Sequence, residues 1–294
     1  MAKQTMQLST KAFDKLFPNE AACDAFLIAR RWPNGVRCPR CKSERVYALQ
    51  TQENKWECPD CREGGAYRFS HLVGTIFENT NLDLLDWFKV IHLMLTSKKG
   101  MSARQIHRYM GFGSYKTAWY VCHRVRAALQ DKDFRKLMGI VEVDETYFGG
   151  KPRKGQPTLY GRATKKQPII GAVSRKGTVV ARMIDKINSA NLQGFVHEVV
   201  SDKVSILITD QFTGYHGLRK SFPHKTVNHA AKQYVVGAIH TNTIEGFWSL
   251  FKRGVVGSYH KVSRKYLPLY IAEFQFRYNN RDNEDIFGAA IAAC

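Results

Sequence analysis

Four cysteines in two closely spaced pairs constrain the fold of this 294-residue chain more than any other feature. Cys38 and Cys41 form one CxxC pair, Cys58 and Cys61 form a second, and 16 residues separate the pairs. This spacing is typical of a zinc site, because two CxxC turns complete a tetrahedral shell of four sulfurs. Such a closed shell leaves no position for a substrate. We therefore expect a zinc ribbon with a structural Zn2+. Together with an N-terminal helical segment it would form a domain over residues 1–75.

The chain carries a large excess of positive charge, which predicts a polyanionic partner. It contains 45 Lys and Arg against 25 Asp and Glu, a formal net charge of +20 with a pI near 9.7. Charge of this size favours nucleic acid over an anionic membrane. The longest apolar stretches fall short of the roughly 20 residues that a spanning helix needs. The first residues lack the apolar core of a signal peptide, so we expect a cytoplasmic, nucleoid-associated protein without a membrane partner.

The segment 76–138 predicts a small all-helical unit with the outline of a helix-turn-helix. Residues 84–95 are apolar and long enough for a core helix. Ser102 precedes Gln105 by three residues, a capping-box pattern that opens a second helix. A glycine turn then leads into a basic third helix, the order of elements in a helix-turn-helix. We expect this unit to bind DNA through three basic side chains of the third helix, namely Lys116, Arg124 and Arg126.

From residue 139 onward the pattern changes to strands and helices, which predicts an α/β domain over residues 139–294. Three strands come first, a helix follows, and then strands and helices alternate. The expected strands are 140–148, 167–174, 178–184, 204–209 and 225–228, and the expected helices are 189–200, 241–253 and 265–279. This order predicts a mixed sheet of the ribonuclease H-like type.

Candidate catalytic carboxylates fall at positions where open α/β sheets place their ligand sites. Asp144 lies on the first expected strand, and Asp210 lies at the carboxyl end of the fourth. The helix 241–253 has an apolar stripe that would face the core. Its second, polar stripe consists of Asn242, Glu245, Ser249 and Lys252. Seven residues are almost two helical turns, so Glu245 and Lys252 lie on one edge, where they could bind a metal ion and DNA phosphate.

Longer motifs resemble those of DDE transposases. Asp210 and Glu245 are separated by 34 residues, and Lys252 follows seven positions after Glu245. The matching motifs are Val143-Asp-Glu-Thr-Tyr-Phe-Gly-Gly-Lys, Ile208-Thr-Asp, His240-Thr-Asn-Thr-Ile-Glu-Gly-Phe-Trp-Ser-Leu-Phe-Lys-Arg and Glu273-Phe-Gln-Phe-Arg-Tyr-Asn-Asn-Arg. Together they resemble bacterial insertion-sequence transposases of the ISXO-like group, which carry an N-terminal zinc ribbon. The resemblance covers roughly residues 15–285.

The resemblance implies a DNA transposase with a ribonuclease H-like (DDE) catalytic domain that uses Mg2+ or Mn2+. Asp144 and Asp210 would be metal ligands, Glu245 would be the third, and Lys252 would contact phosphate. Parts of this group have Asn at the third position, so Asn242 stays open as the alternative. Two hard cations held by carboxylate oxygens can promote in-line displacement at phosphorus. Such an enzyme would cleave the element ends and join their 3′-hydroxyls to target DNA, as a homo-oligomer that handles both ends.

A basic insertion at residues 151–166 separates the first two strands of the catalytic domain. Its six basic residues are Lys151, Arg153, Lys154, Arg162, Lys165 and Lys166, and it contains no acidic residue. A solvated loop is one interpretation. Beside a site that cuts phosphodiesters we expect instead a clamp on the DNA backbone, with strongly salt-dependent binding.

Two other classes of protein remain alternatives to a transposase. A zinc-ribbon DNA-binding regulator would need only residues 1–138 and would leave the carboxylates without a role. A ribonuclease H-like nuclease would use the same metal ions without strand transfer. Joining of the cleaved strand to a second DNA distinguishes a transposase from both alternatives.

Overall fold

The chain folds into two compact units. The computed structural model describes residues 8–61, 65–131, 134–149, 166–227 and 240–294. Unit 1 comprises Met1–Leu129 and Arg281–Cys294, and unit 2 comprises Gln130–Asn280. None of the helices in these described ranges is long and apolar enough to cross a membrane.

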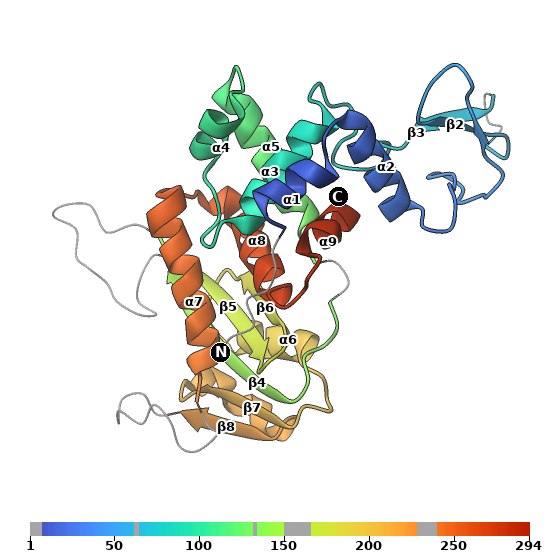
Figure 1. Ribbon diagram of the computed structural model, residues 1–294. Helices are drawn as coiled ribbons and strands as arrows, with labels where there is room; N and C mark the ends of the chain where they lie inside the picture. Colours follow the sequence, from blue (N-terminus) through green and yellow to red (C-terminus); the bar gives the residue numbers. More distant parts are fainter. Residues whose placement is uncertain (1–7, 62–64, 132–133, 150–165, 228–239) are drawn as a thin grey trace. The chain divides into compact units, whose positions relative to one another are not determined.

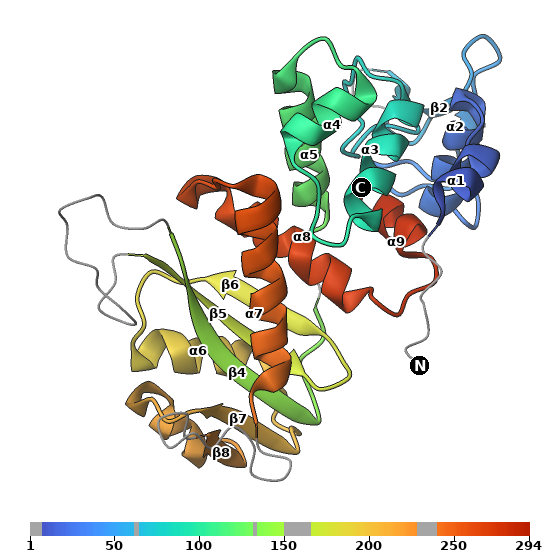
Figure 2. The same ribbon diagram turned by 60° about the vertical axis from the view of Figure 1, so that its left-hand side comes forward.

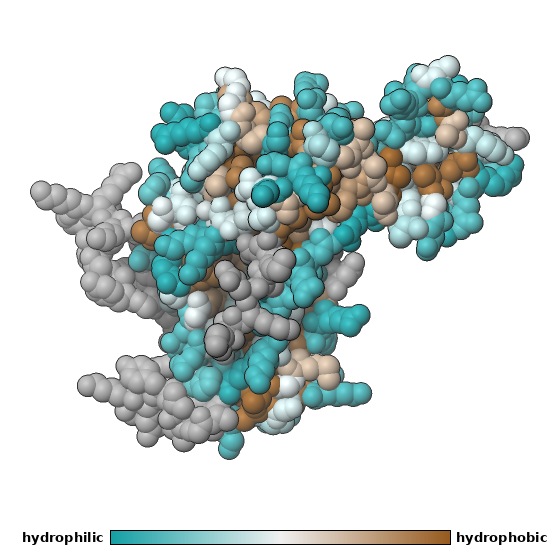
Figure 3. All heavy atoms as spheres, viewed as in Figure 1, coloured by the Kyte–Doolittle hydropathy of each residue, from teal (hydrophilic) through white to brown (hydrophobic). Residues whose placement is uncertain are grey.

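A small antiparallel sheet in unit 1 forms the expected zinc ribbon. Its strands β1 (Tyr47–Ala48), β2 (Lys55–Cys58) and β3 (Tyr67–Ser70) pair in the order β1-β2-β3. Phe69 on β3 packs with buried Cys38 and Cys58. Hydrophobic residues gather in the middle of the ribbon and hydrophilic residues cover its periphery (Figure 3). The ribbon therefore has only a small apolar core beside its sulfurs.

Aromatic side chains from four helices of unit 1 pack together, namely α1 (Thr10–Leu16), α2 (Glu20–Arg31), α3 (Leu84–Thr96) and α9 (Ile286–Ala293). Helices α4 (Ala103–Met110) and α5 (Tyr115–Ala128) also belong to this unit. Phe287 on α9 lies with its ring centroid 5.4 Å from Phe17 and 5.5 Å from Phe88. The sequence prediction placed residues 281–294 in the catalytic domain. In the structure, α9 packs instead against α2 and α3 of unit 1.

The expected helix-turn-helix elements are present in α4 and α5. Ser102 caps α4 by accepting a hydrogen bond from the Gln105 amide at 3.3 Å. Gly111 ends the helix with φ +63°, a left-handed conformation that glycine adopts without steric cost. Ser114 then caps α5 by accepting from the Lys116 amide.

Unit 2 is built on a five-stranded mixed sheet with the strand order β6-β5-β4-β7-β8. The strands are β4 (Ile140–Phe148), β5 (Gln167–Ser174), β6 (Val179–Met183), β7 (Ile206–Asp210) and β8 (His224–Val227). β4, β5 and β6 are antiparallel neighbours, whereas β7 runs parallel to β4 and β8 runs parallel to β7. Three antiparallel strands followed by two parallel ones is the ribonuclease H-like topology, so this prediction is confirmed.

Helices cover both faces of this sheet. They are α6 (Ser189–Val199), α7 (Asn242–Gly254) and α8 (Leu267–Asn279), with short helical segments η2 (Thr213–Lys220), η3 (Val255–Tyr259) and η4 (Arg264–Tyr266). Val141 and Val143 of β4 pack in one core cluster with residues of α6 and η2. A second cluster joins the other face to α7 and α8, and Figures 1 and 2 both show α7 running along β4 and β5. Because side chains alternate along a strand, Glu142 and Asp144 belong to the α7 face.

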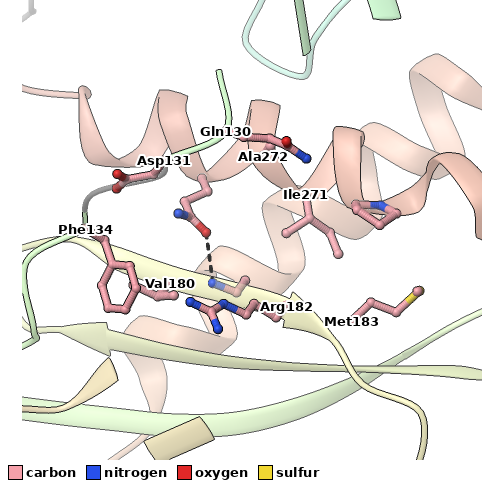
Figure 4. Close-up of a pocket in the computed structure, with 11 residues that line it drawn as sticks. Gln130, Asp131, Phe134, Val180, Arg182, Met183, Ile271 and Ala272 are labelled. Carbon is pink, nitrogen blue, oxygen red and sulfur yellow. Dashed lines mark hydrogen bonds between the residues drawn. The ribbon is translucent and has the colours of Figure 1, made fainter. Parts of the chain in front are cut away.

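The edge strand β6 is covered by side chains of α8. Gln275 accepts a hydrogen bond from the Ala181 amide at 2.9 Å, drawn as a dashed line in Figure 4. Asn279 accepts from the Val179 amide and donates to the Val179 carbonyl. A cavity of about 350 Å³ lies between this strand and α8. Three backbone groups that this edge strand would offer to another chain are thus occupied from within unit 2.

Candidate active site and metal centre

The four predicted zinc ligands form a compact sulfur cluster. Cys38 Sγ lies 3.7 Å from Cys61 Sγ, and Cys41 Sγ lies 3.6 Å from Cys58 Sγ. All four ligand atoms lie within 4.8 Å of one another. Sulfurs placed tetrahedrally around zinc, with Zn–S bonds of about 2.3 Å, are about 3.8 Å apart. The cluster therefore fits a closed four-sulfur zinc site.

The thiol of Cys38 has a lowered pKa. Burial acts to raise the pKa of Cys38, but hydrogen bonds from the Cys41 and Arg40 amides and the contacts with the other thiols lower it overall to about 7. Backbone amides at a CxxC turn favour the thiolate, which is the form that binds metal. The first CxxC turn, which contains Cys38 and Cys41, is thus suited to bind a cation.

On the α7 face of unit 2, three of the predicted catalytic residues line one cavity. Asp144, Glu245 and Lys252 are lining residues of a cavity of about 390 Å³. The remaining lining residues are Glu145, Thr146, Trp248, Ser249 and Arg253. The carboxylates of β4 and α7 therefore open onto the same space as two exposed cations of α7, Lys252 and Arg253.

Asp144 lies in a strongly acidic environment. Burial, followed by the negative charges of Glu145, Asp210 and Glu245, raises the pKa of Asp144 to about 7. The parallel register pairs Glu142 with Ile208, so the same register continued by two residues brings Asp210 beside Asp144. Asp210 itself ends β7 and accepts a hydrogen bond from the Phe212 amide at 3.0 Å.

Close packing sets the position of α7 against the sheet. Gly171 on β5 is paired with Asp144. A Cβ atom at Gly171 would lie 2.6 Å from Trp248 Cζ2, closer than any ordinary carbon contact. The Trp248 ring thus rests directly on the backbone next to Asp144, and glycine is required beneath it.

The two candidates for the third catalytic position differ in their surroundings. Glu245 lines the cavity, and its charge contributes to the raised pKa of Asp144. Its carboxylate accepts a hydrogen bond from Thr241 Oγ1 at 2.9 Å. Asn242 is exposed at the first turn of α7, and neither it nor Asp210 is among the cavity-lining residues.

The donor set of this site fits a hard cation. Carboxylate oxygens are the ligands that Mg2+ and Mn2+ prefer, and a nearby cation would relieve the repulsion that raises the pKa of Asp144. As they stand, the carboxylates are farther apart than the sulfurs. Within the described ranges, the four cysteines are the one group of three or more His, Cys, Asp or Glu side chains close enough to hold a metal ion.

The three predicted DNA-contacting residues of α5 differ in how exposed their side chains are. Lys116 is exposed. Arg126 is fully buried and donates to the Met101 carbonyl at 3.4 Å, so its assignment as a DNA contact is wrong for this conformation. Arg124 is partly buried, lies over the rings of Trp87 and Tyr120, and faces the Glu78 carbonyl.

Most of the basic insertion lies outside the described residues. This applies to Lys151, Arg153, Lys154, Arg162 and Lys165. Lys166 directly precedes β5 and is partly exposed. Its side chain lies beside Gly149, close to the carboxyl end of β4.

Two acidic residues of β4 carry contacts to which the sequence analysis assigned no role. Glu142 is fully buried and pairs with Arg175 at 2.6 Å. Glu145 accepts a hydrogen bond from Tyr215 at 2.8 Å on the opposite face of the sheet. Strand alternation predicts which face each residue takes, but the partners come from segments 30 to 100 residues away.

Comparisons with known proteins agree with this architecture. Residues 136–279 match the model of the ISXO2-like transposase domain, and residues 18–64 match the transposase zinc-ribbon domain. The chain is 30% identical over 282 residues to an "uncharacterized protein in transposable element ISH50" of Halobacterium salinarum, covering 90% of this chain and 92% of that protein.

Two solved structures show weaker likeness. The Mos1 strand transfer complex matches with 12% identity and a TM-score of 0.30, over 69% of this chain and 73% of that chain. A simian T-cell lymphotropic virus intasome bound to the PP2A regulatory subunit B56 gamma matches with 14% identity and a TM-score of 0.29, over 58% and 67%. The fold assignment rests on the strand order of unit 2 rather than on these two matches.

Proposed function

Since this chain belongs to the ISXO2-like transposase family, we propose that it cleaves the ends of its own element and joins them to target DNA. The observation that carries the proposal is the cavity on the α7 face of unit 2. Carboxylates of Asp144 and Glu245 line it together with the ammonium group of Lys252. Acidic metal ligands beside a phosphate-binding cation are what phosphoryl transfer on DNA requires.

In this proposal three carboxylates would hold Mg2+ or Mn2+: those of Asp144 and Asp210 on neighbouring parallel strands and that of Glu245 on α7. The charge of Glu245 beside Asp144, which contributes to the raised pKa of Asp144, supports Glu245 over Asn242 in that role. When bound, the metal ions would supply Lewis-acid activation of the attacking oxygen and stabilisation of the leaving oxygen. Lys252 binds a non-bridging phosphate oxygen and orients the scissile bond.

The proposed reaction has two displacements at phosphorus. In the first, the oxygen of water bonds to phosphorus at the element end, and the bond to the 3′-oxygen breaks. The leaving 3′-oxygen takes up a proton and becomes a free 3′-hydroxyl. In the second, this hydroxyl bonds to a phosphorus of the target, loses its proton, and displaces a 3′-oxygen of the target strand. Each step exchanges one P–O bond for another, so the reaction needs no covalent bond between protein and DNA.

DNA is the proposed partner of both units. The net charge of +20 provides a long-range attraction for it. In unit 1, exposed Lys116 of α5 and exposed Arg104 and Arg108 of α4 are the proposed contacts to the element ends. In unit 2, Lys166 and the basic insertion are proposed to hold the DNA backbone. We further propose a homo-oligomer, because two element ends must be processed together.

The test uses a plasmid that carries the element with its native flanking DNA. Purified protein is added with Mg2+, and nicks and joined products are mapped at nucleotide resolution. Asp210→Asn is expected to abolish both products and to keep DNA binding, because one ligand oxygen loses its charge. Asp202→Asn is the matched control, since Asp202 is an exposed aspartate in the loop before β7.

The products distinguish the proposed function from its alternatives. Element ends with 3′-hydroxyls that become joined to target DNA, in the wild type and in Asp202→Asn only, agree with a transposase. Cleavage without joining indicates a nuclease. Salt-sensitive binding without cleavage, in Mg2+ and in Mn2+, contradicts the catalytic proposal and favours a DNA-binding protein.

A further inference from the structure

A buried carboxylate lies two residues before Asp144 on the same face of β4. Glu142 has no exposed surface and accepts hydrogen bonds from three groups at the start of α7. These groups are the Thr243 amide at 2.8 Å, the Thr243 hydroxyl at 2.9 Å and the Ile244 amide at 3.1 Å. The side chain thus joins β4 to the helix that carries Glu245 and Lys252.

The start of α7 depends on this carboxylate for its cap. The first amides of a helix have no acceptor within the helix, and a neighbouring side chain usually supplies one. Thr241 occupies the N-cap position but makes no capping hydrogen bond with its side chain. Its hydroxyl donates to Glu245 instead. Glu142 therefore supplies, from about 100 residues away, the acceptor and the negative charge that a helix N-terminus favours.

Arg175 completes this cluster from the turn after β5. Its Nε donates to Glu142 Oε1 at 2.6 Å, and its Nη2 donates to the His240 carbonyl at 3.0 Å. The His240 ring also lies near Glu142, with Nδ1 3.4 Å from Oε1. A buried ion pair adds little net stability, because desolvation offsets the attraction, but it can define one geometry among several.

Distances along the two elements explain what this geometry controls. From Glu142 to Asp144 a strand advances about 6.7 Å. From Thr243 or Ile244 to Trp248 a helix advances about 6–7.5 Å. The Trp248 ring rests on Gly171, the partner of Asp144. The spacing between the Glu142 cap and the Trp248–Gly171 contact is therefore about the same along β4 and along α7. These two contacts hold α7 along the strand, and Glu245 lies between them.

We propose that Glu142 is a positioning residue: by capping α7 from β4, it fixes α7 along the strand and so places Glu245 opposite Asp144. The inference rests on the proposed function, because it concerns the same carboxylates. Glu142 touches neither DNA nor metal in this account. It acts through the backbone of α7.

The test compares Glu142→Gln with Glu273→Gln. The first substitution keeps the size of the side chain. It removes the negative charge that pairs with Arg175 and replaces one of the two oxygens that accept hydrogen bonds from Arg175 and the amides of α7. Glu273 is the matched control, because it is equally buried in unit 2 and paired with an arginine and a tyrosine, Arg277 and Tyr259. Thr243→Val is a milder second variant that removes one hydrogen bond to Glu142 and leaves the backbone cap intact.

Three measurements are made at a temperature where thermal unfolding shows each variant to be folded. The first is amide hydrogen exchange of residues 242–248 in metal-free protein without DNA. The second is Mn2+ binding followed by electron paramagnetic resonance. The third is the rate of element-end cleavage as a function of Mg2+ concentration, with DNA affinity measured alongside.

We expect Glu142→Gln to speed exchange in residues 242–248 about tenfold or more. The Mn2+ dissociation constant should rise about 10- to 100-fold, with a similar loss of cleavage rate and unchanged DNA affinity. Thr243→Val should shift all three in the same direction by less, and Glu273→Gln should shift none.

Two results overturn the inference. One is exchange in residues 242–248 that does not differ between Glu142→Gln and Glu273→Gln. The other is faster exchange with Mn2+ binding and cleavage like those of the control, since Glu142 would then cap the helix without positioning the site. A wild-type protein that neither binds Mn2+ in unit 2 nor cleaves DNA refutes the proposed function instead, and the exchange measurement still decides whether Glu142 holds α7.

Discussion

The contact between Gly171 and Trp248 allows a quantitative prediction for Gly171→Ala. The added Cβ would lie 2.6 and 2.8 Å from two ring carbons of Trp248 and 3.2 Å from Ile244 Cδ1. Ordinary carbon contacts are about 3.5–4.0 Å, so the ring must move by about 1 Å. Trp248 is only 4% exposed and packs among Phe247 and other residues of the α7 core, which leaves it little room.

Overpacking of this kind costs about 1–3 kcal/mol, and we expect about 2 kcal/mol here because the ring is rigid and buried. For a unit of this size, that corresponds to a fall in Tm of about 4–8 °C, measured by calorimetry on the full chain. The rate of DNA cleavage should also fall, and by more than the loss of stability explains. A shift of about 1 Å between Glu245 and Asp144 can cost about 100-fold in rate.

Two further variants test whether the clash is the cause. Gly194→Ala, on an exposed position of α6 with open space around it, should raise stability by about 0.5–1 kcal/mol. Trp248→Leu should make room for the new methyl group, so the double variant should be more stable than the summed single effects by about 1 kcal/mol or more. A Tm for Gly171→Ala at or above that of the wild type, or strictly additive effects, would refute the reasoning.

Three more predictions follow from the zinc ribbon, the buried arginine and a buried histidine. Cys58→Ser, or removal of zinc by a chelator, should unfold the ribbon, seen as loss of bound zinc together with loss of amide protection around β2; protection that survives without zinc would contradict it. Arg126→Gln should lower the Tm of unit 1 by several degrees. Lys116→Gln should leave Tm unchanged, and the slope of log K for DNA binding against log [salt] should become shallower by about one. Burial, and then the charges of Arg219 and His216, lowers the pKa of His224 to about 4. Because an unperturbed histidine has a pKa of about 6.5, His224 takes up a proton at higher pH in the unfolded chain than in the folded one. Stability should therefore be lost between about pH 6.5 and 4, and His224→Gln should reduce that slope of Tm against pH.

Features that depend on short-range spacing could be predicted from the sequence. Each CxxC motif places two thiols three positions apart, 16 residues separate the motifs, and the structure brings all four sulfurs together. The polar stripe of α7 follows from helical periodicity, and the structure places Glu245 and Lys252 on one cavity. The order of strands and helices also follows from local patterns, and it sufficed for the ribonuclease H-like sheet.

Features that depend on long-range packing could not be predicted in the same way. α9 has eight residues, all apolar or glycine, so no amphipathic pattern indicates which surface it covers. Its place in unit 1 is decided by the fit of Phe287 among Phe17 and Phe88. Arg126 is different, because a signal was present. Cys122, Arg126 and Leu129 follow the spacing of a buried helical face, so helical periodicity indicates that Arg126 is buried although its side chain is charged.

The two acidic residues on the α7 face of β4 show why residue type alone does not assign a role. Glu142 faces the start of α7, where backbone amides and Arg175 fill its hydrogen-bonding capacity. Asp144 lies one step along the strand, where α7 presents side chains and a cavity, and its neighbours are other carboxylates that raise its pKa. A carboxylate whose partners are donors stabilises one geometry, and a carboxylate whose partners are acids favours a cation. The position of α7 along β4 therefore decides which acid is structural and which is a candidate for catalysis, and Glu142→Gln tests that division at its source.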